Sequence, residues 1–206
     1  MKDFIFHSSL KLELEQIISA GAVHTPVLCF WGAWGVGKSS FASYLSKTLA
    51  SETIAYDCTV RSQSNILKDI EDRCRSTSLF CLDNDDDKQF QRCFILDEFQ
   101  SLTTTTKNSF KLPLERLTAS EKVLFIIICN ATTKSLSEVL TRAIRSRCHC
   151  INFDVPKTEI NEVVELVLER YPNLKSDYVK QTLPDFRQIV RAGKISGLIN
   201  PISLNA

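Results

Sequence analysis

The sequence predicts an α/β fold: a five-stranded parallel sheet flanked by helices, followed by a small all-helical domain. The first observation is a series of five short apolar runs of strand length, separated by stretches with apolar residues at helical spacing. The second is that polar motifs directly follow three of these runs, where a parallel sheet holds its ligand. The third is that only helical patterns follow residue 155. The five runs are residues 26–31, 53–57, 92–96, 123–129 and 150–153.

Helices are expected before, between and after the strands. Ser8 or Ser9 is expected to cap a first helix that runs to residue 20. The remaining predicted helices cover residues 38–50, 62–74, 107–117 (interrupted by Pro113), 137–145, 159–171, 176–183 and 185–191. Asp154, Val155 and Pro156 mark a boundary, so we expect an α/β domain over residues 1–155 and a helical domain over residues 156–206.

A glycine-rich turn after the first strand carries the clearest chemical signal. Residues 32–39 fit the phosphate-loop pattern G-x-x-x-x-G-K-[ST] without a mismatch. The alternative, a chance glycine turn, is disfavoured because strand, turn and helix together surround phosphate with backbone N–H groups and a helix N-terminus. Lys38 is expected to reach the β- and γ-phosphates, and the Ser39 hydroxyl to bind Mg²⁺. The predicted nucleotide-binding residues are Gly32, Ala33, Trp34, Gly35, Val36, Gly37, Lys38, Ser39 and Ser40.

The third strand ends in a pair of acids, Asp97 and Glu98. At the C-terminal end of a parallel strand, Asp97 can hold Mg²⁺, as in phosphate-loop NTPases generally. Glu98 can orient and deprotonate the attacking water. The alternative is a strand that happens to end in acids, and the phosphate loop upstream argues against it.

Composition limits the class of protein. The net charge is +1, so any contact with nucleic acid must come from a local patch rather than from a strongly basic chain. The N-terminus has no signal-peptide pattern, and the longest apolar run, residues 123–129, is too short to span a bilayer. We therefore expect a soluble, intracellular protein, cytoplasmic or nuclear if eukaryotic, without a membrane partner. The eight cysteines include no close C-x-x-C pair, which favours reduced structural thiols over a zinc site.

Together these motifs resemble an AAA+ ATPase, and Ser146, Arg147 and Cys148 narrow the resemblance. This segment, followed by a strand, is similar to the Ser-Arg-Cys motif of sliding-clamp loaders, the family of replication factor C small subunits and of bacterial and phage clamp-loader ATPases. The resemblance implies that Arg147 is a finger that reaches the γ-phosphate bound by a neighbouring subunit. Taken alone, Arg147 would be interpreted as a surface arginine at a helix C-terminus.

The resemblance also assigns roles to two residues that the motifs alone leave open. Asn130, at the end of the fourth strand, would sit between γ-phosphate and water, although a simple strand-end cap is the alternative. Arg187, in a segment similar to the phage-type lid, would touch the γ-phosphate from the helical domain. The family's N-terminal segment, which closes over adenine, is expected to be short or altered. The C-terminal collar of the family is expected to be lacking.

The implied function is a Mg-ATP-dependent sliding-clamp loader subunit in DNA replication, with ATP and Mg²⁺ as cofactors. The implied partners are other AAA+ clamp-loader subunits in a homo- or hetero-oligomer, the sliding clamp and primer–template DNA. Two alternatives stay open: a helicase-loader or initiator-type AAA+ ATPase, and a nucleotide-binding partner subunit with little turnover of its own. The candidate DNA contacts are Arg61, Lys107, Lys111 and Lys134, each of which is also explained as solvated surface.

Overall fold

A five-stranded parallel sheet organises the computed structural model, which describes residues 4–19, 26–60, 63–76, 88–120, 122–131 and 135–199. The spatial order of the strands is β2-β3-β4-β1-β5. The strand with the phosphate loop, β1, therefore lies between β4 and β5, and the polar C-terminal ends of these strands meet at one edge. The strands are β1 (Val27–Gly32), β2 (Ala50–Asp57), β3 (Phe90–Asp97), β4 (Val123–Asn130) and β5 (His149–Asn152).

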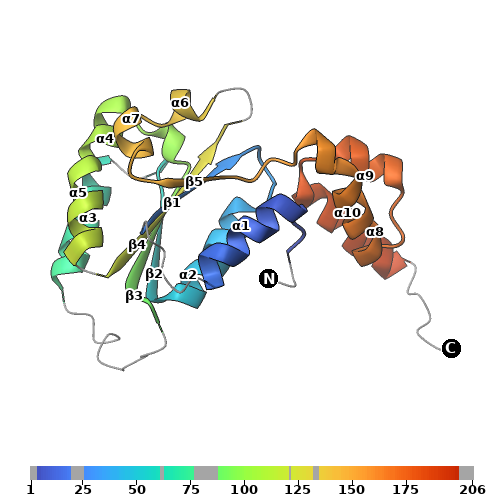
Figure 1. Ribbon diagram of the computed structural model, residues 1–206, viewed down its shortest axis with the longest axis horizontal. Helices are drawn as coiled ribbons and strands as arrows, with labels where there is room; N and C mark the ends of the chain where they lie inside the picture. Colours follow the sequence, from blue (N-terminus) through green and yellow to red (C-terminus); the bar gives the residue numbers. More distant parts are fainter. Residues whose placement is uncertain are drawn as a thin grey trace.

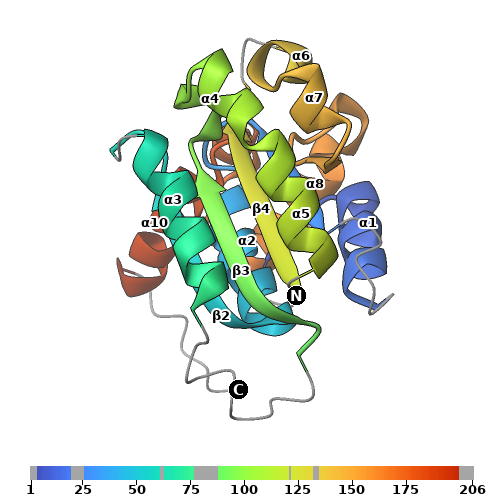
Figure 2. The same cartoon turned by 90° about the vertical axis from the view of Figure 1, so that its left-hand side faces the viewer.

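Helices cover both faces of the sheet. Alternate strand residues point to opposite sides, and here apolar residues on both sides are buried under helices. On β1, Val27 and Cys29 belong to one buried cluster, and Leu28 and Phe30 belong to the other. The second cluster lies under α1 (Ser8–Ser19) and α2 (Lys38–Leu49). Figures 1 and 2 show these two helices on one side of the sheet and α3 and α5 on the other. The helices packed on the first cluster are α3 (Gln63–Arg75), α5 (Lys111–Ser120), α6 (Leu136–Val139) and α7 (Arg142–Arg145).

The C-terminal helices form a separate body beside the sheet (Figure 1). They are the 3₁₀ helix η3 (Lys157–Glu159), α8 (Ile160–Arg170), α9 (Ser176–Thr182) and α10 (Phe186–Ile199). Their own apolar cluster contains Val163, Val164, Val167, Val179 and Ile189. The start of α1 is joined to this body, because Ser9 Oγ donates to Glu159 Oε1 at 2.8 Å and Ser8 N donates to Glu162 Oε1 at 3.1 Å. The fold class expected from the sequence is confirmed, whereas the domain boundary after residue 155 stays a prediction.

Two helices that the sequence predicted as continuous are each divided in two in the structure. The expected helix over residues 107–117 is two helices, α4 (Thr104–Ser109) and α5, and the break is at Phe110 rather than at Pro113. Pro113 lies in the first turn of α5, where a backbone N–H would have no partner within the helix and its loss costs little. The expected helix over residues 137–145 is also divided, because Leu140 is extended and Thr141 begins a new turn that accepts from Arg145 N at 2.9 Å.

The first helix begins at Ser8, so neither Ser8 nor Ser9 precedes it as its cap. Instead, carboxylates of the C-terminal body accept from the first turn: Ser8 N donates to Glu162 Oε1 at 3.1 Å and Ser9 N donates to Glu159 Oε2 at 3.2 Å. His7, just before the helix, is buried, and its Nδ1 lies 3.0 Å from Glu159 Oε2. In the part of the chain that the structure describes, no helix is both long and apolar enough to cross a membrane.

Candidate nucleotide-binding site

The phosphate loop connects the buried strand β1 to the N-terminus of α2. Gly35 and Gly37 have φ values of +76° and +95°, a region in which a side chain is strained. Gly37 is the N-cap residue of α2, and its carbonyl accepts from Phe41 N at 2.9 Å. Because the first N–H groups of a helix have no partner within it, the end of α2 offers donors and a positive dipole end to an anion.

Lys38 is almost fully buried, with 5% of its surface exposed. Its Nζ donates to the carbonyl of Gly32 at 2.9 Å and to that of Ala33. Burial lowers the pKa of Lys38 to about 8, while the carboxylates of Asp154, Asp97 and Glu98 oppose this by stabilising the charged form. The ammonium group is therefore held inside the loop, beside a small cavity.

That cavity brings together nine of the residues singled out from the sequence. It has a volume of about 350 Å³ and is bounded by the phosphate loop, the ends of β3 and β4, and the start of α10. The lining residues are Gly35, Gly37, Lys38, Ser39, Ser40, Asp97, Glu98, Asn130 and Arg187. The space is of the size and chemistry that a chain of phosphates requires.

A hydroxyl and a carboxylate lie side by side at this cavity. Ser39 Oγ donates to Asp97 Oδ2 at 3.0 Å, which joins the first turn of α2 to the end of β3. Both groups are hard oxygen ligands of the kind that Mg²⁺ prefers. Ser39 and Asp97 thus fit the predicted magnesium site as the residues that would hold the ion.

Glu98 lies directly after β3 in a left-handed conformation, with φ 55° and ψ 37°. Its two carboxylate oxygens accept from different amides. Asn130 Nδ2 donates to Oε1 at 2.6 Å, and Gln100 Nε2 donates to Oε2. Asn130 N in turn donates to Gln100 Oε1 at 3.1 Å, which closes a three-residue network. A strained backbone fixed by side-chain hydrogen bonds is common at functional sites.

Gln100 is the member of this network that the sequence did not reveal. It lies in the short 3₁₀ helix η2 (Phe99–Ser101), from which its Oε1 reaches the backbone N–H of Asn130 at the end of β4. In an extended strand Gln100 would lie on the same face as Glu98 but further along the chain, whereas the 3₁₀ turn brings the two side chains into hydrogen-bond contact. The signal that could have identified Gln100 was therefore the end of the strand at Asp97.

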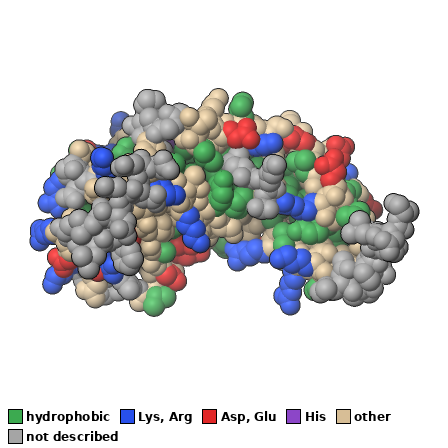
Figure 3. All heavy atoms as spheres, turned by 90° about the horizontal axis from the view of Figure 1, so that it is seen from below, with side chains coloured by type: hydrophobic (Ala, Val, Ile, Leu, Met, Phe, Trp, Pro, Cys, Tyr) green, Lys and Arg blue, Asp and Glu red, His purple; other side chains and the backbone are tan. Residues whose placement is uncertain are grey.

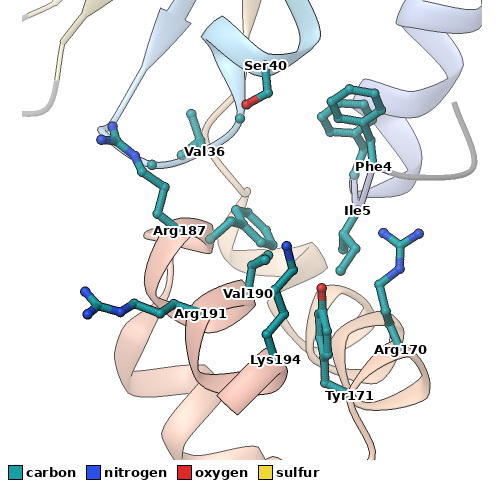
Figure 4. A pocket seen from close by; sticks show the side chains of 14 residues that line it. Phe4, Ile5, Val36, Ser40, Arg170, Tyr171, Arg187, Val190, Arg191 and Lys194 are labelled. Carbon is teal, nitrogen blue, oxygen red and sulfur yellow. The ribbon is translucent and has the colours of Figure 1, made fainter. Parts of the chain in front are cut away.

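A second cavity of about 690 Å³ continues from the phosphate loop between the N-terminal segment and the C-terminal helices. Phe4, Ile5, Val36, Tyr171 and Val190 give it apolar walls (Figure 4). Its lining also includes the basic residues Arg170, Arg187, Arg191 and Lys194. Apolar walls with a few polar groups are typical of small-molecule pockets. Phe4 and Ile5 of the N-terminal segment line this cavity, and the expectation that this segment is short or altered stays a prediction.

Comparison with known proteins places this geometry in a family. The family described as "ATPase family associated with various cellular activities (AAA)" matches residues 28–154, which are more than half of the chain. The chain belongs to this AAA family. Nucleotide binding and the predicted enzyme class, an ATPase, are those of the family.

Among individual proteins, the replication factor C small subunit of Methanococcus maripaludis is 30% identical to this AAA chain over 164 residues. The alignment covers 77% of the chain and 45% of that protein, so the chain spans less than half of this relative's length. Two solved structures show the same fold. A replication initiator DnaA bound to AMPPCP and single-stranded DNA has a TM-score of 0.63, 16% identity, and coverage of 96% of this chain and 64% of that chain. A Thermotoga maritima RuvB variant has a TM-score of 0.59, 17% identity, and coverage of 94% and 62%.

Arg187 and Arg147 of this AAA chain occupy different places. Arg187, at the start of α10, extends toward the phosphate loop (Figure 4) and lines both cavities. Arg147, after α7, is absent from the lining of either cavity within the described residues. Its Nε and Nη2 lie 2.7 Å and 2.6 Å from Glu115 Oε1 on α5, and its Nη1 donates to the carbonyl of Ala143.

The structure describes only two of the four candidate DNA contacts, Lys107 and Lys111. The prediction for Lys107 was wrong, because the side chain is buried and Nζ donates to the carbonyls of Gln100 at 3.0 Å and Val139 at 2.9 Å. A buried ammonium group satisfied by backbone carbonyls is not available to a DNA phosphate. Lys111 is exposed at the start of α5, and its contact with DNA stays a prediction. Arg61 and Lys134 lie outside the described residues.

Proposed function

We propose that this chain is a Mg-ATP-dependent ATPase subunit of clamp-loader type, which hydrolyses ATP at its own cavity and supplies Arg147 to a neighbouring subunit. The observation that carries the proposal is that Arg147 lines neither of the chain's two described cavities. Its guanidinium group is held by Glu115 and Ala143 at a part of the surface that does not line the chain's own cavities. A cation that acts on a phosphate must therefore act on one bound elsewhere. The 30% identity to a replication factor C small subunit supports the same interpretation.

Within the chain's own site, each polar side chain has a distinct part in the proposal. Lys38 and the N–H groups at the start of α2 bind the phosphates, and Arg187 contacts them from α10. Bound Mg²⁺ would supply charge neutralisation of the phosphates, with Ser39 and Asp97 as its protein ligands. Glu98 takes the proton of the attacking water, and Asn130 orients both the carboxylate and the water.

The orientation of Glu98 supports this assignment. Two amide donors satisfy its oxygens, so the carboxylate is fixed rather than free to rotate. Phosphoryl transfer depends chiefly on positioning and electrostatic stabilisation, and the fixed Glu98 carboxylate positions the attacking water. The neighbour's Arg147 provides the electrostatic stabilisation, because a cation stabilises the charge that spreads over the transferring phosphoryl group.

The proposed role is tested by steady-state ATP turnover of the chain with its cognate sliding clamp and primed DNA. We expect clamp and primed DNA to stimulate turnover, and Arg147→Ala to abolish the stimulation while leaving nucleotide binding intact. Arg142→Ala is the matched control, because Arg142 is an exposed arginine at the start of α7, the helix that precedes Arg147, and it is expected to retain the stimulation. An ATP turnover rate that is unchanged by clamp, by primed DNA and by Arg147→Ala would contradict the proposal.

The same measurement separates the two alternatives. Stimulation by the cognate helicase rather than the clamp would favour a helicase-loader or initiator-type ATPase. Turnover that stays low with every partner, while a partner's own ATPase depends on Arg147 of this chain, would favour a nucleotide-binding subunit that only supplies the finger. DNA contacts through Lys111 belong to the proposal and predict a weaker, salt-dependent affinity for primed DNA in Lys111→Ala.

A further inference from the structure

The carboxylate of Asp154 lies against the first half of the phosphate loop. Asp154 comes two residues after β5, and its Oδ1 accepts a hydrogen bond from Ala33 N at 2.6 Å. A Cβ atom on Gly32 would lie 2.8 Å from the same oxygen, so the carboxylate occupies space that only a glycine leaves open. The hydrogen bond is short and charge-assisted, which makes it stronger than one between neutral groups.

The peptide units that Asp154 contacts are the ones that hold Lys38. Lys38 Nζ donates to the carbonyls of Gly32 and Ala33, and the Gly32 carbonyl also accepts from Ala131 N at 3.2 Å. Asp154 therefore fixes the N–H side of a turn whose carbonyl side orients the ammonium group. The conformation of this turn determines where Lys38 can place its charge.

The C-terminal body contacts the loop a second time, near its middle. Phe186 N, at the start of α10, donates to the carbonyl of Gly35 at 3.0 Å, and a Cβ atom on Gly35 would overlap the Asp185 carboxylate. Asp185 Oδ1 also accepts from Arg187 N at 3.0 Å, which fixes the first turn of α10. The loop is thus held at Ala33 by Asp154, which precedes the helical body, and at Gly35 by Phe186, at the start of the last helix of that body.

We infer that Asp154 is a positioning residue for nucleotide binding, and that it acts by accepting the Ala33 N–H and so holding the phosphate loop in its phosphate-binding shape. The inference does not depend on the clamp-loader proposal, because it concerns any nucleoside triphosphate at this loop. Asp154 also ties that shape to the segment that leads into the C-terminal helices. Figure 3 shows the hollow between the two parts of the molecule, with Lys and Arg side chains on the side of the C-terminal helices.

The test compares Asp154→Ala with Asp154→Asn in equilibrium binding of Mg-ATP. Asp154→Ala removes the acceptor, and we expect the affinity to fall at least about tenfold. Asp154→Asn keeps an oxygen that can accept from Ala33 N, and we expect it to stay within about threefold of the wild type. Asp177→Asn, an exposed acid on α9, is the matched control and is expected to bind as the wild type does.

Binding of inorganic tripolyphosphate and of adenosine separates positioning from a general loss of structure. A loop that is misplaced loses affinity for tripolyphosphate by the same factor as for ATP, whereas binding of adenosine is unchanged. If Asp154→Ala does not fold, Asp154→Ser takes its place in the comparison. Asp154→Ala that binds ATP like the wild type, Asp154→Asn that is as weak as Asp154→Ala, or an equal loss for adenosine would overturn the inference.

Discussion

Arg187 and Arg147 are both assigned to a γ-phosphate, yet their surroundings differ in every respect. Arg187 is exposed at the start of α10 and extends toward the phosphate loop of its own chain. Arg147 has 21% of its side chain exposed and is paired with Glu115, at a site outside both cavities. The difference teaches that proximity to the phosphate loop divides the predicted residues into two sets: those near the loop, which we propose act within the chain, and Arg147, which we propose acts on a neighbour.

The largest expected effect within the first set is that of Glu98→Gln. The amide cannot accept a proton from water, so kcat should fall about 100-fold or more, in line with the usual contribution of a general base. Binding of Mg-ATP should stay near that of the wild type, because Lys38 and the loop N–H groups are unchanged. Single-turnover hydrolysis together with equilibrium binding checks this. A variant that hydrolyses ATP at the normal rate would remove Glu98 from the proposed mechanism.

The next effect concerns Arg187 itself. Arg187→Ala removes a charge-assisted hydrogen bond to phosphate, which is worth about 1.5–3 kcal/mol and corresponds to about a 10- to 150-fold loss of ATP affinity. The control is Arg142→Ala, an exposed arginine on α7 that lines neither of the two cavities. Equilibrium binding of ATP and of AMP distinguishes a γ-phosphate contact from a contact with the base or ribose. Equal losses for both nucleotides would contradict the assignment.

A third effect follows from the pKa of Lys38, which burial lowers to about 8. Above this pH the free protein holds neutral lysine, while bound phosphates favour the charged form, so binding must take up a proton. We expect ATP affinity to fall by up to about tenfold per pH unit above about pH 8 and to be flat below it. In Lys38→Arg the guanidinium stays charged over this range, so the alkaline decline should vanish whatever the affinity of the variant. A decline that persists in Lys38→Arg would point to another group.

The smallest expected effect on stability is that of Glu115→Gln. This variant also tests the proposed role of Arg147, because Glu115 is its ion-pair partner. The pair with Arg147 is partly exposed, so its loss should change the free energy of unfolding by about 1 kcal/mol or less. The finger would nevertheless lose its ordering partner, and we expect clamp- and DNA-stimulated turnover to fall several-fold while ATP binding stays constant. Urea unfolding and stimulated turnover, measured on the same preparation, check both statements. A large loss of stability with unchanged stimulation would show that Glu115 serves the fold instead of the finger.

The central strands were predictable because burial governs nearly all of their residues. Residues 123–129 of β4 are apolar on both faces, since helices cover both sides of the sheet. The phosphate loop was equally predictable, because glycine spacing and the following lysine are required by the contact with phosphate. Local composition determined these features, so the sequence alone was sufficient.

Helix breaks and hydrogen-bond partners were less predictable, because they depend on contacts between distant segments. Nothing local marks Leu140 as extended, yet it is 1% exposed and packs in the core where a continuous helix was expected. Lys107 was expected at the surface because lysine is rarely buried, but two carbonyls from separate segments satisfy its charge. Gln100 and Asp154 were missed for the same reason: their partners, Glu98 with Asn130 and Ala33, are brought to them only by the fold.

The most direct test of the central claim is a mixing experiment with two defective variants. Arg147→Ala keeps an intact site of its own but lacks the finger, whereas Glu98→Gln keeps the finger but lacks the base. If Arg147 acts on a neighbour, mixing the two with clamp and primed DNA should give a turnover well above the sum of the separate rates. A mixture whose rate equals that sum, with Arg147→Ala alone as active as the wild type, would contradict the assignment of Arg147 to a shared site.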